Sequence, residues 1–357
     1  MTTLTELCLA FLLIVPRSFG AEILTEPQQA TFTNPVIANG ADPWVIRWEE
    51  QYFLSQSRRG GIWVNRSKTL SGIGENHWVR VWIAPTNTAY SRNIWAPELQ
   101  RINGEWFIYF AADDGNNANH RMYVLQGTTQ NPQDPFLFKG KIAAPTDRWA
   151  IDGTVLKMPG GKLYFIWSGW EGFEDGAQNL YIASMSDPFT ISGERVRISR
   201  PEHAWEKRVW PVVNEGPEPL WNGAQLFLIY SASGSWTDHY CLGQLTFVGG
   251  DPLDAQSWRK KSTPVFQATD SVFGPGHCSF VKSRDGKEDW IVYHSAREKG
   301  SGWRRQINMQ RFTWHTDGSP NFGTPIPPGE PIPLPSGDRP EKQLRRDFET
   351  PVELCVP

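Results

Sequence analysis

One plan recurs five times along the 357-residue chain, and this internal repeat constrains the fold more than any other feature of the sequence. Each copy reads as a lead residue, a short apolar strand, a turn, and an aromatic-rich strand that ends in small residues. Four copies place residues that readily supply positive φ between the two strands: Asn103-Gly104, Gly160-Gly161, Asn222-Gly223 and Asp285-Gly286. Each copy is therefore predicted to contain a β-hairpin, with Trp48-Glu49-Glu50 as the turn of the first.

The lead residues set the spacing of the repeat. They are Asp42, Pro97, Asp152, Glu215 and His277, and successive ones are separated by 55, 55, 63 and 62 residues. Such a length accommodates about four strands per copy, the size of a propeller blade. Five blades closed into a ring protect their sheet edges and direct the first strand of every blade at a central channel. The sequence thus predicts an all-β, five-bladed β-propeller as one domain over residues 28–335, with the lead residues converging on the channel.

The composition agrees with many short strands and excludes some classes of partner. The chain contains 18 Trp, 32 Gly and 28 Pro, and few stretches show the helical spacing of apolar residues. Its 35 basic and 38 acidic residues give a formal net charge of −3, so no broad surface for nucleic acid or anionic lipid is expected. A neutral partner fits better, and part of the Trp side chains could offer flat surfaces to sugar rings.

Both ends of the chain are predicted to lie outside the propeller. The apolar block from Leu7 to Pro16, followed by Ser18-Phe19-Gly20, is typical of a signal peptide, so residues 1–20 are predicted to direct secretion. No run approaches the roughly 20 apolar residues that would span a bilayer, and no membrane anchor is expected. Residues 324–337 carry six prolines and are predicted to be a closing segment or a linker, and residues 338–357 a C-terminal tail.

The cysteines give no zinc signature. Cys8 would leave with the signal peptide, and Cys241, Cys278 and Cys355 form an odd set without C-x-x-C spacing. In a secreted protein two of the three could pair, or the thiols could stay free and buried. The sequence leaves both alternatives open.

Three lead residues are carboxylates, and this combination points to a reaction. Asp42, Asp152 and Glu215 lie among apolar or turn residues rather than beside Lys or Arg. An unpaired buried carboxylate is costly, so three at equivalent positions favour a functional site over three turn caps. Glycoside hydrolysis needs an acid that protonates the leaving oxygen and a carboxylate that activates water or attacks the sugar. A third carboxylate can raise the pKa of the acid through its like charge. The propeller is therefore predicted to be a single catalytic domain with these three carboxylates in its site.

The lead segments of all five blades resemble the blade signatures of glycoside hydrolase family 43. They read Asn39-Gly40-Ala41-Asp42-Pro43-Trp44, Asn93-Ile94-Trp95-Ala96-Pro97-Glu98-Leu99, Ala150-Ile151-Asp152-Gly153-Thr154, Asn214-Glu215-Gly216-Pro217-Glu218 and Gly274-Pro275-Gly276-His277. The resemblance implies hydrolysis with inversion, with Asp42 as general base, Glu215 as general acid and Asp152 as the residue that tunes and orients the acid. Inversion in turn predicts that the carboxyl groups of Asp42 and Glu215 lie roughly 6.5 to 9.5 Å apart.

Two further strings narrow the resemblance within the family. Trp167-Ser168-Gly169-Trp170-Glu171-Gly172 and Ser231-Ala232-Ser233-Gly234-Ser235-Trp236-Thr237 are similar to α-L-arabinofuranosidases that remove terminal arabinose from α-1,5-linked arabinan. This implies an enzyme acting on arabinose-containing oligosaccharides or polysaccharides of the plant cell wall, and the predicted signal peptide makes it secreted and extracellular. Open alternatives are a β-xylosidase, an endo-arabinanase or an arabinoxylan-specific arabinofuranosidase. A non-catalytic carbohydrate-binding propeller is the alternative from another class.

Three more residues are predicted to bind substrate. Trp95 could stack on a sugar ring, Arg297 could reach the sugar or Glu215, and His277 leads the fifth blade. One imidazole does not define a metal site, so no cofactor is predicted as required, and calcium in the central channel stays open. The segment 113–117 resembles the start of a calcium loop, but it lacks the remaining ligands and is predicted to be a polar loop near the channel mouth.

Overall fold

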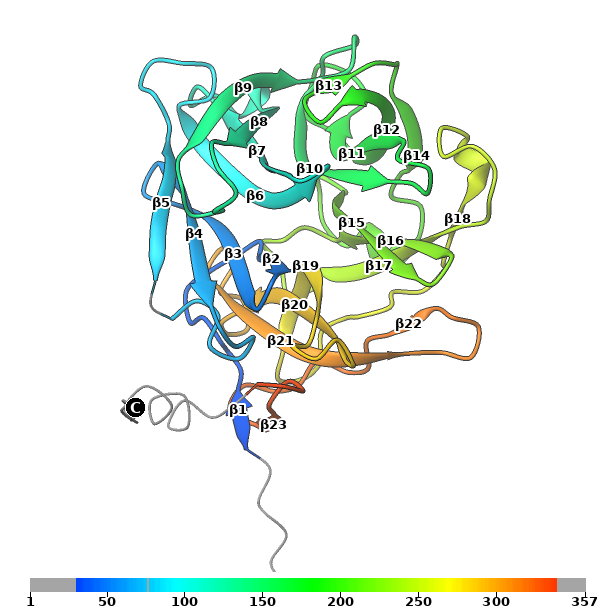
Figure 1. Ribbon diagram of the computed structural model, residues 1–357. Coiled ribbons are helices and arrows are strands. Elements are labelled where there is room, and N and C mark those ends of the chain that lie inside the picture. The colour runs from blue at the N-terminus through cyan, green and yellow to red at the C-terminus, as the bar shows by residue number, and fades with distance from the viewer. Residues whose placement is uncertain (1–29, 76, 339–357) are drawn as a thin grey trace, which may run out of the picture.

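The chain folds into five antiparallel sheets arranged as blades around a central channel, as Figure 1 shows. The computed structural model describes residues 30–75 and 77–338. Within these ranges the all-β, five-bladed propeller predicted from the repeat is confirmed, and no helix there is long and apolar enough to cross a membrane. The predicted signal peptide and residues 339–357 of the predicted tail lie outside the described residues.

Each blade consists of consecutive strands, and the innermost strand comes first in the sequence. Blade 1 contains β2 (Trp44–Trp48), β3 (Gln51–Arg58), β4 (Gly61–Ser67) and β5 (Trp78–Ile83). Blade 2 contains β6 (Arg92–Ile102), β7 (Glu105–Asp113), β8 (Arg121–Gly127) and β9 (Phe136–Ile142). Blade 3 contains β10 (Ala150–Lys157), β11 (Leu163–Trp170), β12 (Gln178–Asp187), β13 (Thr190–Ile191) and β14 (Val196–Ser199). Blade 4 contains β15 (Asn214–Asn222), β16 (Gln225–Ala232), β17 (Cys241–Phe247) and β18 (Trp258–Lys260). Blade 5 contains β19 (Phe273–Lys282), β20 (Asp289–Ala296), β21 (Arg305–Trp314) and β22 (Pro320–Asn321).

The hydrophobic core is divided into five clusters, and each cluster lies between two neighbouring blades. Between blades 2 and 3, for example, Phe107 and Tyr109 pack with Phe165 and Trp167. The alternation of side chains along a strand sends successive residues to opposite sheet faces, so each sheet contributes to two clusters. Burial of apolar surface between blades therefore stabilises the ring as well as each sheet.

The ring closes between blades 1 and 5, and the segment before blade 1 pairs with β21 through an isolated antiparallel bridge between Ile37 and Ile307. The backbone N–H of Val45 in blade 1 donates to Ser279 Oγ in blade 5 at 3.0 Å. Outside the blades, β1 (Thr31–Thr33) pairs with β23 (Pro331–Pro333), so the proline-rich segment lies against the start of the described chain. Three short 3₁₀ turns complete the described elements: η1 (Asn117–Asn119), η2 (Ala204–Glu206) and η3 (Ala255–Ser257).

The chain is kinked near the start of every inner strand. Backbone φ is positive at Asp42 (48°), Ala96 (41°), Asp152 (53°), Gly216 (53°) and His277 (44°). In β6, β10, β15 and β19 the pairing register shifts around the kink, as at a β-bulge. Residues other than glycine rarely adopt positive φ, and such strain gathers at functional sites. The five kinks thus mark one end of the channel as a candidate site.

The alignment of the repeat is wrong by one residue in two blades. The sequence pattern aligns Pro97 and Glu215 with Asp42, whereas the kinked residues there are Ala96 and Gly216. A bulge adds one residue to a strand without changing the apolar pattern that follows, so spacing alone could not reveal it.

The cysteine alternatives are settled for two of the three residues. Cys241 and Cys278 are both buried and free. Cys355 lies outside the described residues.

Candidate active site

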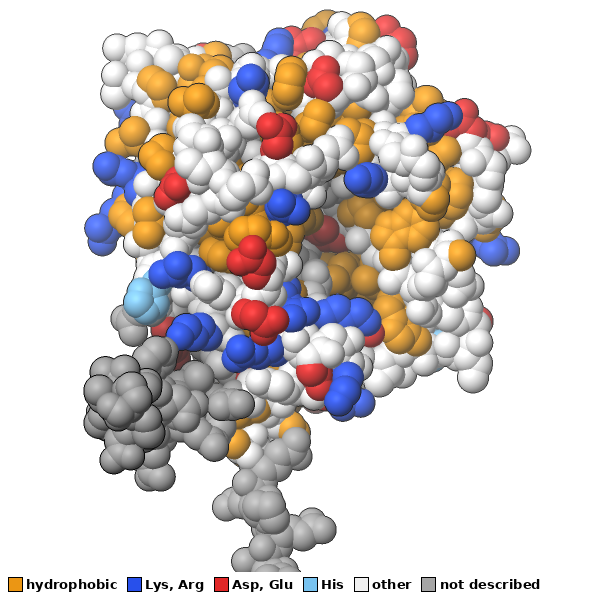
Figure 2. All heavy atoms as spheres, in the orientation of Figure 1, with side chains coloured by type: hydrophobic (Ala, Val, Ile, Leu, Met, Phe, Trp, Pro, Cys, Tyr) orange, Lys and Arg blue, Asp and Glu red, His pale blue; other side chains and the backbone are white. Residues whose placement is uncertain are grey.

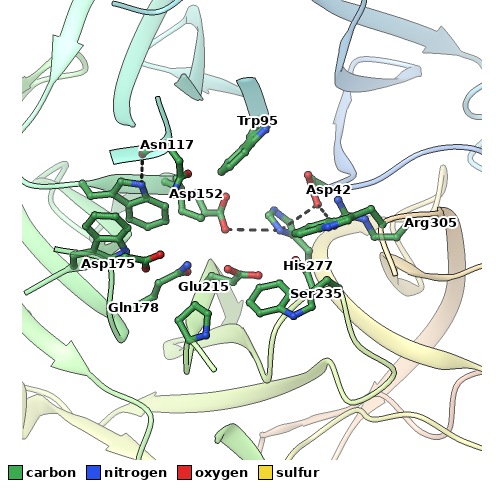
Figure 3. Close-up of a pocket in the computed structure, with 16 residues that line it drawn as sticks. Asp42, Trp95, Asn117, Asp152, Asp175, Gln178, Glu215, Ser235, His277 and Arg305 are labelled. Atoms are coloured by element: carbon green, nitrogen blue, oxygen red, sulfur yellow. Dashed lines mark hydrogen bonds and ion pairs between the residues drawn. The ribbon is translucent and has the colours of Figure 1, made fainter. Parts of the chain in front are cut away.

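A pocket of about 380 Å³ opens at the end of the channel where the inner strands begin. This volume falls in the usual range for small-molecule sites. Asp42, Asp152, Glu215, His277 and Trp95 all line it, and Figure 3 shows the three carboxylates grouped around one space. Figure 2 shows the hollow in the middle of this face, with acidic side chains in its depth and hydrophobic ones at its rim.

Asp42 is surrounded by cationic and imidazole groups. Arg305 Nη1 donates to its Oδ1 at 3.3 Å, and the Nδ1 atoms of His294 and His277 lie 3.1 and 3.4 Å from the same oxygen. Burial alone would raise the pKa of Asp42, but Arg305, His277 and His294 outweigh it and hold the pKa well below its usual range. Asp42 is therefore an ionised carboxylate throughout the neutral range.

Glu215 has the opposite environment. It is 5% exposed at the start of β15, and the hydroxyl of Tyr240 donates to its Oε1 at 2.8 Å. Burial raises the pKa of Glu215, the Tyr240 hydrogen bond opposes the shift, the negative charge of Asp42 adds to it, and the net result is a pKa of about 7. Glu215 thus carries a proton up to neutral pH.

Asp152 interacts with both of the other carboxyl groups. It is 4% exposed, its Oδ2 accepts from the backbone N–H of Gly216 at 3.1 Å, and His277 Nδ1 lies 3.9 Å from the same oxygen. Burial, and then the charges of Glu215 and Asp42, raise the pKa of Asp152 well above its usual range. Asp152 and Glu215 therefore compete for protons, as like charges in one site do.

The arrangement can supply acid and base together at one place. An ionised carboxylate can take a proton from water, and a buried carboxyl with a pKa near 7 can give a proton to a leaving oxygen. These are the two groups that glycoside hydrolysis requires.

Trp95 is held as a flat surface at the pocket edge. It is 37% exposed and stacks on His120 with ring centroids 4.0 Å apart and an interplanar angle of 26°. His120 Nδ1 lies 2.9 Å from a carboxylate oxygen of Asp113, which also accepts from the side chain of Asn93 at 3.0 Å. The polar 113–117 loop brings Asn117 into the pocket lining, so it lies at the channel mouth as predicted.

The prediction for Arg297 is wrong. Arg297 is exposed and does not line the pocket, and its Nε donates to the backbone oxygen of Arg305 at 3.3 Å. Arg305 is the arginine that reaches the site, because it begins β21 directly opposite Ala296 at the end of β20. Arg297, directly after β20, thus lies outside the pocket, whereas Arg305, the first residue of β21, lines it.

Sequence reasoning also missed two aromatic pairs in the pocket wall. Trp149 and Trp170 of blade 3 stack with centroids 4.8 Å apart and an interplanar angle of 5°. Trp236 and Trp303, on loops of blades 4 and 5, lie 5.7 Å apart, and Trp303 is 64% exposed. The strings quoted above contain Trp170 and Trp236, so the abundance of Trp was the available signal. Exposed aromatic side chains at a pocket rim are suited to contact with sugar rings.

A second acidic layer lies beneath the first. Glu98 and Glu218, each two residues beyond a kinked position, are 3% and 4% exposed. Burial raises the pKa of both well above the usual range. The Gln100 amide donates to Glu98 Oε2 at 2.7 Å and to Thr154 Oγ1 at 2.9 Å. Period-two alternation explains why these side chains also face the channel.

The donor groups do not fit a metal ion. Among residues 30–75 and 77–338, no three His, Cys, Asp or Glu side chains are grouped as a metal site would require. The oxygens of Asp42 and Asp152 are engaged by Arg305, histidine and backbone N–H groups.

Comparison with known proteins assigns the family. Residues 32–320 match the model of "Glycosyl hydrolases family 43". The "Extracellular exo-alpha-(1->5)-L-arabinofuranosidase" of Streptomyces avermitilis is 36% identical over 343 residues, which cover 91% of this chain and 70% of that protein. A protein of the same name from Streptomyces chartreusis is 34% identical, covering 76% of this chain and 85% of that protein.

A solved structure agrees with these relatives. The α-L-arabinofuranosidase of Lactobacillus brevis superposes with a TM-score of 0.78 and 36% sequence identity, covering 84% of this chain and 98% of that chain. The family match extends across all five blades and the three carboxylates. The chain therefore belongs to the glycosyl hydrolases of family 43, enzymes that cleave glycosidic bonds.

Proposed function

We propose that this glycoside hydrolase is a secreted, exo-acting α-L-arabinofuranosidase. It would release terminal L-arabinofuranose from α-1,5-linked arabinan or arabino-oligosaccharides of the plant cell wall. The observation that carries the proposal is the 36% identity, over 91% of this chain, to an extracellular enzyme named for that activity. The predicted signal peptide at residues 1–20 supports secretion.

The shape of the pocket rim supports exo action. Between the second and third strands, four blades raise long loops at residues 114–120, 171–177, 233–240 and 297–304. Blade 1 has only a two-residue turn at residues 59–60 in the same place. A pocket walled on four sides and low on one admits the end of a chain more readily than its middle.

The proposed chemistry is a single displacement with inversion. The carboxylate of Asp42 takes a proton from water while the water oxygen forms a bond to the anomeric carbon. Glu215 gives its proton to the glycosidic oxygen as the bond from that oxygen to the anomeric carbon breaks. Asp42 is then protonated and Glu215 ionised, and exchange with water returns both groups to their starting states. The opposite pKa shifts of Asp42 and Glu215 support these roles.

The remaining pocket residues have supporting roles in this proposal. Asp152 competes with Glu215 for a proton, because the charge of Glu215 raises the pKa of Asp152, and it orients Glu215 through the Gly216 backbone N–H. Trp95 offers its face to the sugar, and His277 and Arg305 hold the Asp42 carboxylate in place.

The proposed reaction requires no cofactor. Each proton in it is carried by a carboxyl group of the chain or by water. Dialysis against EDTA is expected to leave kcat unchanged. A loss of activity that added calcium restores would favour the alternative of an ion in the channel.

A panel of substrates tests the proposed specificity. Linear arabino-oligosaccharides, arabinoxylan and xylo-oligosaccharides are incubated with the enzyme, and the first product is observed by NMR. Release of single arabinose units as the inverted anomer is expected. Xylose without arabinose would indicate a β-xylosidase, internal cleavage an endo-arabinanase, and no hydrolysis a carbohydrate-binding propeller.

A further inference from the structure

A fully buried glutamate lies outside the pocket and has no role in the chemistry described above. Glu206 is the last residue of η2, in the connection between blades 3 and 4, and it is 0% exposed. Burial of a carboxylate is costly unless partners replace its water. Such a residue therefore calls for a structural or functional reason.

Five donors from four segments surround Glu206. Its Oε2 accepts from the backbone N–H groups of Glu202 and His203, each at 2.8 Å. Its Oε1 accepts from Tyr230 Oη at 2.9 Å, from Asn214 Nδ2 at 2.9 Å and from Lys260 Nζ at 2.8 Å. The donors come from the blade connection, β15, β16 and β18, so Glu206 joins these segments at one point.

Lys260 completes the cluster with a positive charge. Its side chain is 11% exposed, and its Nζ also lies 3.3 Å from Asn214 Oδ1. Burial raises the pKa of Glu206, but Lys260 and the two backbone N–H groups lower it by a larger amount, so the net pKa is below its usual value. Glu206 and Lys260 thus form a buried, hydrogen-bonded ion pair rather than two neutral groups.

The cluster holds Asn214, the residue immediately before Glu215, in place by hydrogen bonds. Asn214 is 0% exposed, and its Oδ1 also accepts from Ser199 Oγ at 2.7 Å. Its backbone oxygen accepts from Ser168 Oγ at 2.9 Å. Both ends of the Asn214 side chain and its carbonyl are therefore fixed, and the backbone that carries Glu215 starts from a rigid point.

The same loop reaches the pocket. The connection that begins at Glu202 and His203 continues to Pro211, which lines the pocket beside Glu215. Ser233, at the start of the 233–240 loop that carries Trp236, donates its hydroxyl to the backbone oxygen of Trp205. The buried ion pair thus underlies the part of the pocket around Glu215.

We propose that Glu206 and Lys260 are positioning residues for Glu215, acting through Asn214. The inference rests on the proposed role of Glu215 as general acid. Proton transfer in the transition state tolerates little misplacement, since a shift of about 1 Å can cost on the order of 100-fold in rate. Loss of the ion pair would release the backbone before Glu215 and weaken proton donation to the leaving oxygen.

The test uses leaving groups that need different amounts of acid help. An arabino-oligosaccharide has a poor leaving group and requires the proton, whereas a 2,4-dinitrophenyl arabinofuranoside has a good one and does not. Lys260→Met and Glu206→Gln are expected to lose about tenfold or more in kcat on the oligosaccharide and to stay within about threefold on the aryl substrate. Glu215→Ala should show the same pattern more strongly.

A matched control separates positioning from loss of stability. Gln310 is 3% exposed and also forms several buried hydrogen bonds, donating to the backbone oxygens of Phe322 and Thr324 at 2.8 and 3.1 Å. Gln310→Leu should lower the melting temperature and change both substrates equally. Lys260→Arg keeps the charge and should restore much of the oligosaccharide activity that Lys260→Met loses.

The outcomes decide between the proposals. Equal losses on both substrates, or no loss, in Lys260→Met and Glu206→Gln would overturn the positioning role. If Glu206→Gln does not fold, Tyr230→Phe removes one of the five donors and should show a weaker form of the same pattern.

A wild-type enzyme specific for xylosides would contradict the arabinose proposal alone, because the same comparison of leaving groups can then be made with aryl xylosides and xylo-oligosaccharides. A Glu215→Ala variant without the leaving-group pattern would overturn both the acid role and this inference.

Discussion

Two carboxyls in one pocket acquire opposite properties from their neighbours. Arg305, His277 and His294 face Asp42, so its charge is stabilised despite burial. Glu215 has Tyr240 as a neutral partner and Asp42 as a like charge, so burial prevails and its pKa rises. The difference between base and acid is therefore a property of the surroundings and not of the residue type.

The pKa of Glu215 predicts how activity depends on pH. Because Glu215 must carry a proton and its pKa is raised to about 7, kcat/KM is expected to fall as pH rises through about 7. Asp42 must be ionised, and its lowered pKa keeps it so, which places the acidic limb far below the basic one. A pH profile of kcat/KM checks this prediction, and a plateau extending above pH 9 would contradict it.

Tyr240 offers a way to move the basic limb. Its hydrogen bond favours the ionised form of Glu215, so Tyr240→Phe should raise the pKa of Glu215 and shift the limb to higher pH by about one unit or less. Tyr293→Phe is the matched control, because Tyr293 is also fully buried and its hydroxyl donates to Gln310, away from the pocket. An unchanged limb in Tyr240→Phe would show that the hydrogen bond does not act on the ionisation.

Arg305 and Arg297, both in blade 5, are expected to differ in their effect on activity. Arg305→Ala removes the largest opposing charge beside Asp42, so the pKa of Asp42 should rise and activity should be lost as the pH is lowered. Loss of about 100-fold in kcat/KM at neutral pH is expected, because a misplacement of about 1 Å in a catalytic group can cost that much. Arg297→Ala, outside the pocket, should retain activity, and pH profiles of both variants test the assignment.

At the scale of elements, the sequence predicts the hairpins of the blades, but it does not predict the kinks and loops at the pocket end of the strands. Asn103-Gly104 is the two-residue turn between β6 and β7, with positive φ at both residues as tight hairpins require, whereas Asp285-Gly286 lies in a longer connection over residues 283–288. The kink at Ala96, one residue before Pro97, left no trace in the apolar pattern. Arg305 was missed because the loop at residues 297–304 decides which residue re-enters the pocket, and loop geometry does not follow from strand periodicity.

The loop after β7 supports a prediction about substrate binding. Trp95 rests on His120, which Asp113 holds in turn, so the three residues form one rigid unit. Trp95→Ala should raise KM about tenfold, the equivalent of 1.4 kcal/mol of lost stacking. His120→Ala should raise KM less, because Trp95 remains but loses its support. Steady-state kinetics on arabinotriose check both values, and unchanged KM in Trp95→Ala would exclude stacking on this face.

At the scale of the whole molecule, the pocket depends on closure of the ring. Asp42 belongs to blade 1, whereas His277, His294 and Arg305, which surround it, belong to blade 5. The repeat predicted the number of blades and their convergence, because spacing and lead residues are written in the chain. It could not predict the contacts across this seam, since they join Asp42 to residues 235, 252 and 263 positions further along the chain.

Asn34 tests whether the seam limits stability. Its amide donates to the backbone oxygen of Met309 at 3.0 Å, and its Oδ1 accepts from the Met309 backbone N–H at 2.9 Å, which ties the start of the described chain to blade 5. Asn34 is 2% exposed, so Asn34→Ala would leave two buried backbone groups without partners and cost about 1–3 kcal/mol of unfolding free energy. Asn321→Ala, which removes an exposed side-chain hydrogen bond within blade 5, should cost far less unfolding free energy.

Because separation of the seam also separates Asp42 from Arg305, activity in Asn34→Ala should be lost at the same lowered temperature at which the protein unfolds. Chemical denaturation and thermal inactivation measure the two effects, and equal stability of both variants would show that the clusters between blades close the ring without this bond.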